Sequence, residues 1–157
     1  MGVASPQGWA RFAWQSDYGQ FYLVDCGDVA FEAPVEITPQ MEQTGVATPK
    51  AGLVVYTQGC LQQHIQIAIY ASEPEGSPVE PLSGRPWTRV STATASFPSR
   101  AFGLSSPSFP HPLPAGPLFV LDAERVNVRI EWMEHPEGRD DSVPVEPDVI
   151  AVTLWPA

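Results

Sequence analysis

The chain has 157 residues, the usual length of one domain, and its 43% hydrophobic and 10% aromatic residues suffice for a single core. Eighteen acidic against eight basic residues give a formal charge of −10, which disfavours direct binding to nucleic acid or to an anionic membrane surface. Eighteen prolines, roughly twice the average usage, favour punctuated strands over long helices, because proline breaks a helix interior but is tolerated in loops.

The N-terminal stretch "MGVASPQGWARF" (1–12) has no basic start followed by an apolar run and no small-residue cleavage site, so it does not resemble a secretory signal. No stretch approaches the roughly 18 consecutive apolar residues of a membrane span. We therefore expect a soluble, cytoplasmic protein. In that compartment Cys26 and Cys60 are expected to be free, buried thiols.

Apolar and polar residues alternate with a period of two in several stretches, which predicts β-strands. The three isoleucines of "HIQIAIYA" (64–71) share one face. In "RVNVRIEWM" (125–133) the apolar residues point inward, while Glu131 and the other polar residues point outward. The expected strands cover residues 9–14, 19–25, 52–57, 64–71, 88–97, 118–122, 125–133 and 148–155.

Two connections are crowded with proline, "SEPEGSPVEPLSGRP" (72–86) and "GLSSPSFPHPLPAGP" (103–117), and are expected to be long loops rather than domain linkers. Residues 31–49 show no strand pattern, and "PQMEQTG" (39–45) is compatible with a short helical turn.

These elements predict an all-β fold, an antiparallel β-sandwich of about eight strands with long proline-rich loops, formed as one domain over 1–157. In this fold 125–133 and 148–155 are expected to pair across the acidic stretch that joins them.

Motifs for catalysis or metal binding are absent from the sequence. His64, His111 and His135 are isolated from one another and from the cysteines, so no zinc spacing exists. No nucleophile elbow, phosphate-binding loop, dinucleotide fingerprint or HExxH motif occurs. We expect no cofactor, no metal and no enzymatic activity.

The connection between the last two strands is the most acidic part of the chain. About 14 residues long, it exceeds the usual hairpin loop, and loops of this length tend to be functional or disordered. Three interpretations stay open: a solvated loop, a cation site, and a patch that binds a protein partner. The candidate partner-binding residues are Glu131, Glu134, Glu137, Asp140, Asp141, Glu146 and Asp148.

A protein-interaction module is the function that this pattern favours, and two other classes compete with it. Five tryptophans on a sandwich allow a sugar-binding platform, for which Trp87 at a strand start is the test position. The third class is a hydrolase whose catalytic residues are scattered along the chain.

Three stretches carry a resemblance: "QSDYGQFYLVD" (15–25), "WTRVSTATASF" (87–97), and "RVNVRIEWMEHPEGRDD" (125–141) followed by "PDVIAVTLWPA" (147–157). Together they resemble a group of uncharacterised bacterial β-sandwich proteins and, more distantly, the competence protein J family of nuclease inhibitors. The Pro-Gly turn of that group is replaced here by "LDAER" (121–125). The resemblance implies a protein that binds a basic partner, a nuclease or toxin, with carboxylates placed where phosphates would lie.

Overall fold

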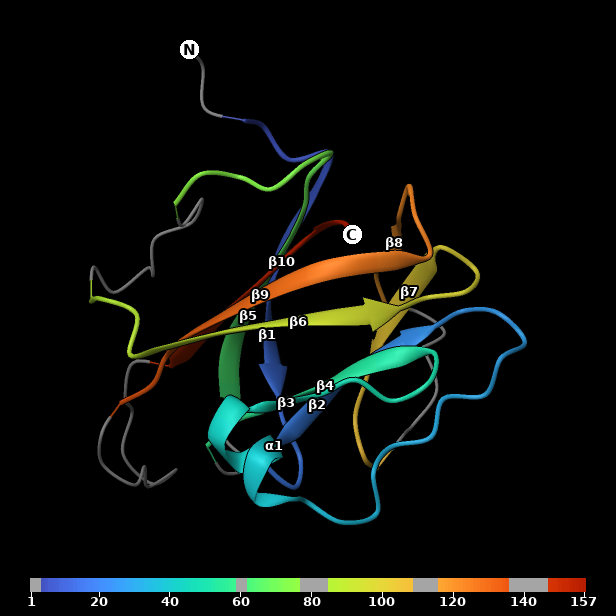
Figure 1. Cartoon of the computed structure of the whole chain (residues 1–157). Helices are drawn as coiled ribbons and strands as arrows, with labels where there is room; N and C mark the ends of the chain where they lie inside the picture. The colour runs from blue at the N-terminus through green and yellow to red at the C-terminus, as the bar shows by residue number, and fades with distance from the viewer. Residues whose placement is uncertain (1–3, 59–61, 77–84, 109–115, 136–146) are drawn as a thin grey trace.

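The computed structural model describes residues 4–58, 62–76, 85–108, 116–135 and 147–157, which form two five-stranded sheets packed face to face (Figure 1). The first sheet has the order β1-β5-β10-β9-β6 and the second β3-β4-β2-β7-β8. The strands of the first sheet are β1 (Gly8–Gln15), β5 (Gln62–Ile69), β10 (Asp148–Pro156), β9 (Arg125–Met133) and β6 (Arg89–Ser96). The strands of the second are β3 (Val46–Ala47), β4 (Gly52–Tyr56), β2 (Gln20–Asp25), β7 (Ala101–Ser105) and β8 (Leu118–Val120). The predicted all-β sandwich is confirmed.

The predicted pairing of the two C-terminal strands is also confirmed, since β9 and β10 are antiparallel with Ile150 opposite Trp132. One pairing differs from the expected antiparallel arrangement, because β10 lies parallel to β5, with Ile150 opposite Ile65. β10 is therefore the central strand of the first sheet, and all its residues except the last are buried. A strand buried on both faces accepts a nearly continuous apolar sequence, so its local pattern does not reveal its direction.

Side chains from both sheets fill the space between them. The three isoleucines of β5 and Trp132 of β9 point into this core, as their alternation predicts. From the second sheet they meet Phe21, Leu23, Leu53, Phe102 and Leu104. Burying a large apolar side chain contributes about 1.5–3 kcal/mol to folding, so this layer is the main source of stability.

The short helix α1 (Pro39–Thr44) confirms the predicted helical turn. Thr38 is its N-cap, and Thr38 Oγ1 accepts a hydrogen bond from Met41 N at 3.2 Å. Gly45 ends the helix in the left-handed region, with φ at 73°, and donates its N–H to Met41 O at 2.7 Å. The caps stop α1 directly before β3.

The structure differs from the prediction in two ways. It contains two strands that the pattern does not predict, β3 and β7. In addition, part of the outer face of the first sheet is buried. Gln66 of β5 and Thr153 of β10 lie on that outer face and yet are buried. On the same face Tyr70, just after β5, packs with Ala68 and Trp155. A residue that points away from the core is thus not necessarily exposed.

Candidate partner-binding site

The seven acids predicted to bind a partner do not form one exposed group in the described structure. Glu131 lies within β9 and is 4% exposed, and Asp148 begins β10 and is 0% exposed. Asp148 Oδ1 accepts a hydrogen bond from His135 N at 3.0 Å, which ties together the ends of the two strands. Glu134 lies just after β9 at the same end of the sheet. The other four, Glu137, Asp140, Asp141 and Glu146, lie outside the described residues.

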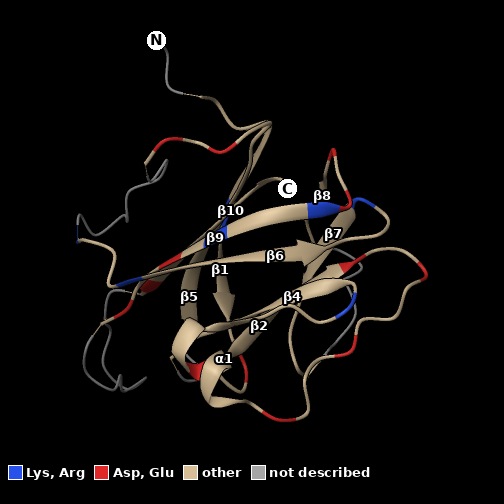
Figure 2. Cartoon of the chain, viewed as in Figure 1, with Lys and Arg blue, Asp and Glu red and all other residues tan. Residues whose placement is uncertain are grey.

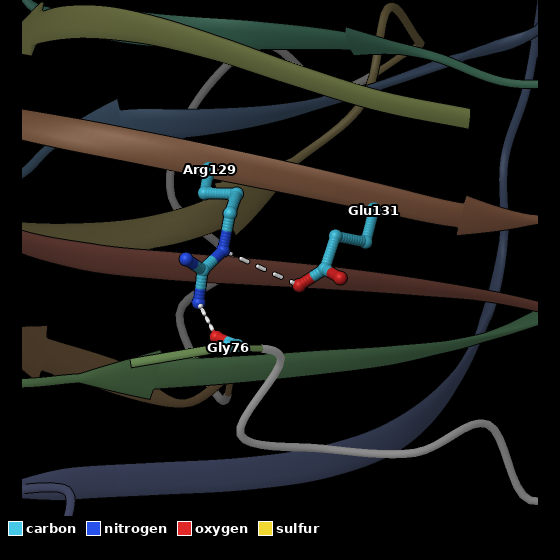
Figure 3. A network of polar contacts seen from close by, with 3 residues as sticks. All are labelled: Gly76, Arg129 and Glu131. Carbon is cyan, nitrogen blue, oxygen red and sulfur yellow. Dashed lines mark hydrogen bonds and ion pairs between the residues drawn. The ribbon is translucent and has the colours of Figure 1, made fainter. Parts of the chain in front are cut away.

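Glu131 belongs to a polar network on the outer face of the first sheet (Figure 3). Its Oε1 lies 3.5 Å from Arg129 Nε, and the two side chains are 5% and 14% exposed. The Arg129 guanidinium also donates to the Gly76 carbonyl and lies 5.8 Å from the ring centroid of Trp155. This network holds the segment after β5 against the sheet, so Glu131 is engaged inside the molecule.

Glu134 has a different environment. Its Oε2 accepts a hydrogen bond from Gln58 N at 3.0 Å, and its own N–H donates to Thr88 Oγ1 at 3.2 Å. Burial raises the pKa of this carboxyl above its ordinary value, Asp148 raises it further, and the Gln58 bond and Arg89 oppose the shift. No described cation lies within ion-pair distance of Glu134, so its charge is only partly compensated.

Arg89 connects α1 to the first sheet. Its Nη2 donates to the carbonyls of Glu42 and Gln43 at 3.2 and 3.3 Å, which satisfies acceptors in the last turn of the helix. Its Cζ lies 4.5 Å from the ring centroid of Trp132, whose Nε1 donates to Tyr56 O at 2.9 Å. The helix is therefore fixed next to Glu134.

These elements surround a hollow of about 400 Å³. The residues that line it are Tyr18, Gly19, Ile37, Glu42, Tyr56, Thr57, Gln58, Arg89 and Glu134. At its rim Tyr18 is 73% exposed and Ile37 is 48% exposed. The hollow thus combines exposed apolar side chains with two carboxylates and the guanidinium of Arg89, whose Nη2 donates to carbonyls of α1. The two carboxylates outnumber this one cation, so the hollow can receive a cationic side chain with an apolar stem.

Sequence reasoning missed Glu42 of the hollow and the acids on the segment that leads to α1. Asp28, Glu32 and Glu36 are exposed on the long segment from β2 to α1, and Glu42 is exposed on α1. Figure 2 shows acidic positions spread along this segment, at the lower right of the view. The sequence signal that could have identified these residues is a series of spaced acids in a stretch without strand alternation. Exposed acids are therefore not confined to the β9–β10 connection.

Other candidate chemistry is sparse. Among the residues that the structure describes, no group of three or more His, Cys, Asp or Glu side chains is arranged to hold a metal ion. Cys26 is a free thiol, but it is exposed just after the end of β2 and not buried as expected. Its limited desolvation and the adjacent Asp25 carboxylate raise its pKa, which disfavours a reactive thiolate. Cys60 and His111 lie outside the described residues.

The described part of the chain holds no helix that is both long and apolar enough to cross a membrane.

Comparison with known proteins finds likeness in structure only. No family model matches the chain, and no curated protein sequence matches it. The crystal structure of ComJ from Bacillus subtilis, an inhibitor of the DNA degrading activity of NucA, is similar with a TM-score of 0.65 and 12% identity over 99% of this chain and 100% of that chain. The structure titled crocagin biosynthetic gene J has a TM-score of 0.59 and 13% identity over 95% of this chain and 97% of that one. The chain therefore shares the ComJ fold, as its sequence resemblance implies.

Proposed function

We propose that this chain is a protein-interaction module of the inhibitor type, which binds a basic protein such as a nuclease. The observation that carries the proposal is the likeness to ComJ, which extends over essentially the whole of both chains. The chemistry supports the proposal, because a nuclease binds phosphates through cationic groups and carboxylates can bind to the same cationic groups. The formal charge of −10 also accelerates encounter with a basic partner.

In this proposal the acids of 131–148 have two roles. Glu131 and Asp148 stabilise the first sheet through contacts within the chain, as their burial favours. Glu134 faces the partner across the hollow, together with Glu42 on α1. Glu137, Asp140, Asp141 and Glu146, which lie outside the described residues, stay in the proposed set of partner-binding acids.

The test begins with capture of the partner. The immobilised chain is incubated with lysate of its native host, and retained proteins are identified by mass spectrometry. We expect a basic nuclease, whose degradation of DNA then falls in proportion to added chain. Retention of no basic protein, or a retained nuclease that stays fully active with excess chain, would overturn the proposal.

Matched variants then locate the contact. The double variant Glu42→Gln, Glu134→Gln removes two charges from the hollow, and Glu73→Gln, Glu75→Gln removes two exposed charges from the segment after β5. We expect the first to weaken binding at least tenfold, equivalent to ~1.4 kcal/mol, and the second to change it little. Equal losses would mean that only net charge matters and would reject the hollow as the contact.

A triple variant tests the rest of the acidic stretch. Glu137→Gln, Asp140→Asn and Asp141→Asn together should also weaken binding at least tenfold, while the melting temperature stays unchanged. An unchanged affinity would remove these acids from the proposed surface.

A further inference from the structure

Tyr18 lies in the turn that connects β1 to β2, next to α1 near the bottom of Figure 1. Across this turn the backbone N–H of Gln20 donates to Asp17 O at 3.2 Å. The two residues between them both have positive φ, 51° at Tyr18 and 65° at Gly19. Positive φ at both central residues is the mark of a type I′ turn, which favours Asn or Asp followed by Gly. Gly19 fits this preference, whereas Tyr18 does not.

Hydrogen bonds on both sides of the turn fix its backbone. Asp17 Oδ2 accepts a hydrogen bond from Ser108 N at 3.1 Å. Gly19 O accepts one from Thr57 N at 2.8 Å. The turn therefore holds Tyr18 in the left-handed region, where the Cβ of a bulky residue is crowded by its own backbone. This conformation lowers the stability of the fold.

The Tyr18 side chain does not offset this loss by packing. It is 73% exposed, so its ring buries little apolar surface within the chain. Positive φ alone does not mark a site, because Ala51 and Arg100 also have it; of the three described residues of this kind, Tyr18 alone is aromatic. A strained residue that the core does not require is a ground for a functional hypothesis. Tyrosine is also enriched among the residues that dominate the affinity of protein interfaces.

Tyr18 lines the hollow that also contains Glu42 and Glu134. Ile37, which is 48% exposed, adds an aliphatic side chain to the same lining. The Arg89 guanidinium of the hollow is already engaged with the Trp132 ring and with carbonyls of α1. An arginine of another protein matches this environment, because its planar guanidinium stacks on aromatic rings and donates to carboxylates, while its stem is apolar.

We propose that Tyr18 is the central contact of the partner interface and that its ring packs against an arginine side chain of the basic partner, whose guanidinium reaches Glu42 or Glu134. The identity of the partner rests on the proposed function, whereas the chemistry of this contact rests on the turn and the hollow. The ring supplies short-range contact that long-range attraction between charges does not supply. Tyr18 therefore controls mainly the rate of dissociation.

The first test needs no partner. Tyr18→Asn introduces a preferred residue of the type I′ turn, and Arg100→Asn is the matched control. Arg100 is exposed, has φ 56°, and lies beyond the end of β6 opposite to Arg89 of the hollow. Both variants should raise the melting temperature, by about 2–4 °C each, because asparagine tolerates the left-handed region better. A melting temperature that falls in Tyr18→Asn would show that the ring stabilises the fold and would overturn the proposal.

The second test is a titration of the isotope-labelled chain with N-acetyl-arginine amide, followed by NMR. We expect the backbone amide resonances of Gly19, Thr57 and Glu42 to shift in the wild type and in Arg100→Asn, and Tyr18→Asn to bind at least about threefold more weakly. Arg100→Asn removes a positive charge, which favours a cationic ligand and so cannot imitate a loss of binding. Equal binding by all three proteins, or shifts confined to other parts of the chain, would overturn the proposal.

The third test distinguishes this inference from the proposed function. Tyr18→Asn should bind a captured nuclease at least about tenfold more weakly, through faster dissociation, while Arg100→Asn binds at least as tightly as the wild type. If Tyr18→Asn keeps full affinity for a nuclease that the variant Glu42→Gln, Glu134→Gln binds weakly, the proposed function stands and the role of Tyr18 is rejected. If no nuclease is captured but N-acetyl-arginine amide binds in a manner that depends on Tyr18, the contact stands and the proposed function is rejected.

Discussion

The ion pair between Arg129 and Glu131 predicts strong thermodynamic coupling between two neighbouring positions of β9. In Arg129→Met the Glu131 carboxylate loses its cation while its side chain is 5% exposed. Removing one partner of a buried pair costs about 3–5 kcal/mol, because the other charge stays buried without compensation. The variant also loses the hydrogen bond to the Gly76 carbonyl. We expect Arg129→Met to be the more damaging single change.

The reciprocal variant Glu131→Leu should cost less, about 1–3 kcal/mol. Its Arg129 remains 14% exposed, keeps the Gly76 carbonyl as an acceptor, and stays near the Trp155 ring. The double variant Arg129→Met, Glu131→Leu replaces the pair by apolar side chains, a replacement that is often neutral. We therefore expect the double variant to be more stable than Arg129→Met alone, with a coupling free energy of at least about 2 kcal/mol.

Urea denaturation of the four proteins at pH 7 measures this coupling, provided that the slopes agree. Each kcal/mol corresponds to roughly 2–4 °C in melting temperature for a chain of this size. Costs that add to within about 0.5 kcal/mol would show that the two charges are energetically independent. That result would refute the interpretation of Glu131 as a structural residue and return it to the set of candidate partner contacts.

Three further changes test other parts of the structure. Gly45→Ala should lower the melting temperature markedly, because alanine at φ 73° costs ~1–2 kcal/mol in the backbone alone and its Cβ would collide with Arg89 and the Trp132 ring; an unchanged melt would contradict this. Glu134→Gln should stabilise the chain at pH 7 but not at pH 3, because a carboxyl whose pKa is raised in the folded state destabilises the fold as pH rises through its ordinary pKa of 4.5. Equal changes in the free energy of unfolding at both pH values would reject the charge explanation. Asp25→Ala should lower the free energy of unfolding, measured in urea, by about 1–3 kcal/mol, because this buried carboxylate accepts three hydrogen bonds. A change near zero would show that these hydrogen bonds do not stabilise the fold.

The position of Glu131 shows where sequence reasoning ends. Alternation correctly placed Glu131 on the face opposite the core residues of β9. It could not indicate that the segment after β5 covers this face, because that contact joins Arg129 to Gly76, far away in the chain. A period-two pattern predicts which face of the sheet a side chain points to, whereas its exposure also depends on which loops cover that face.

Two strands illustrate the same limit for the fold. β7 has the sequence "AFGLS", with a glycine inside and a proline two residues beyond its end, so local signals favour a loop. It forms a strand because its backbone pairs with β2 and β8, and its Phe102 fills the core. The parallel pairing of β10 with β5 likewise arises from the arrangement of the whole sandwich.

The proposed contact at the hollow predicts that binding depends strongly on salt. Contact at the hollow depends on Glu42 and Glu134. Their attraction for a basic partner is screened when the Debye length falls from about 10 Å at 0.1 M to about 3 Å at 1 M salt. Binding of a captured nuclease should therefore weaken at least tenfold between 0.1 and 1 M salt. A nuclease complex whose affinity is insensitive to salt would contradict the carboxylate contact.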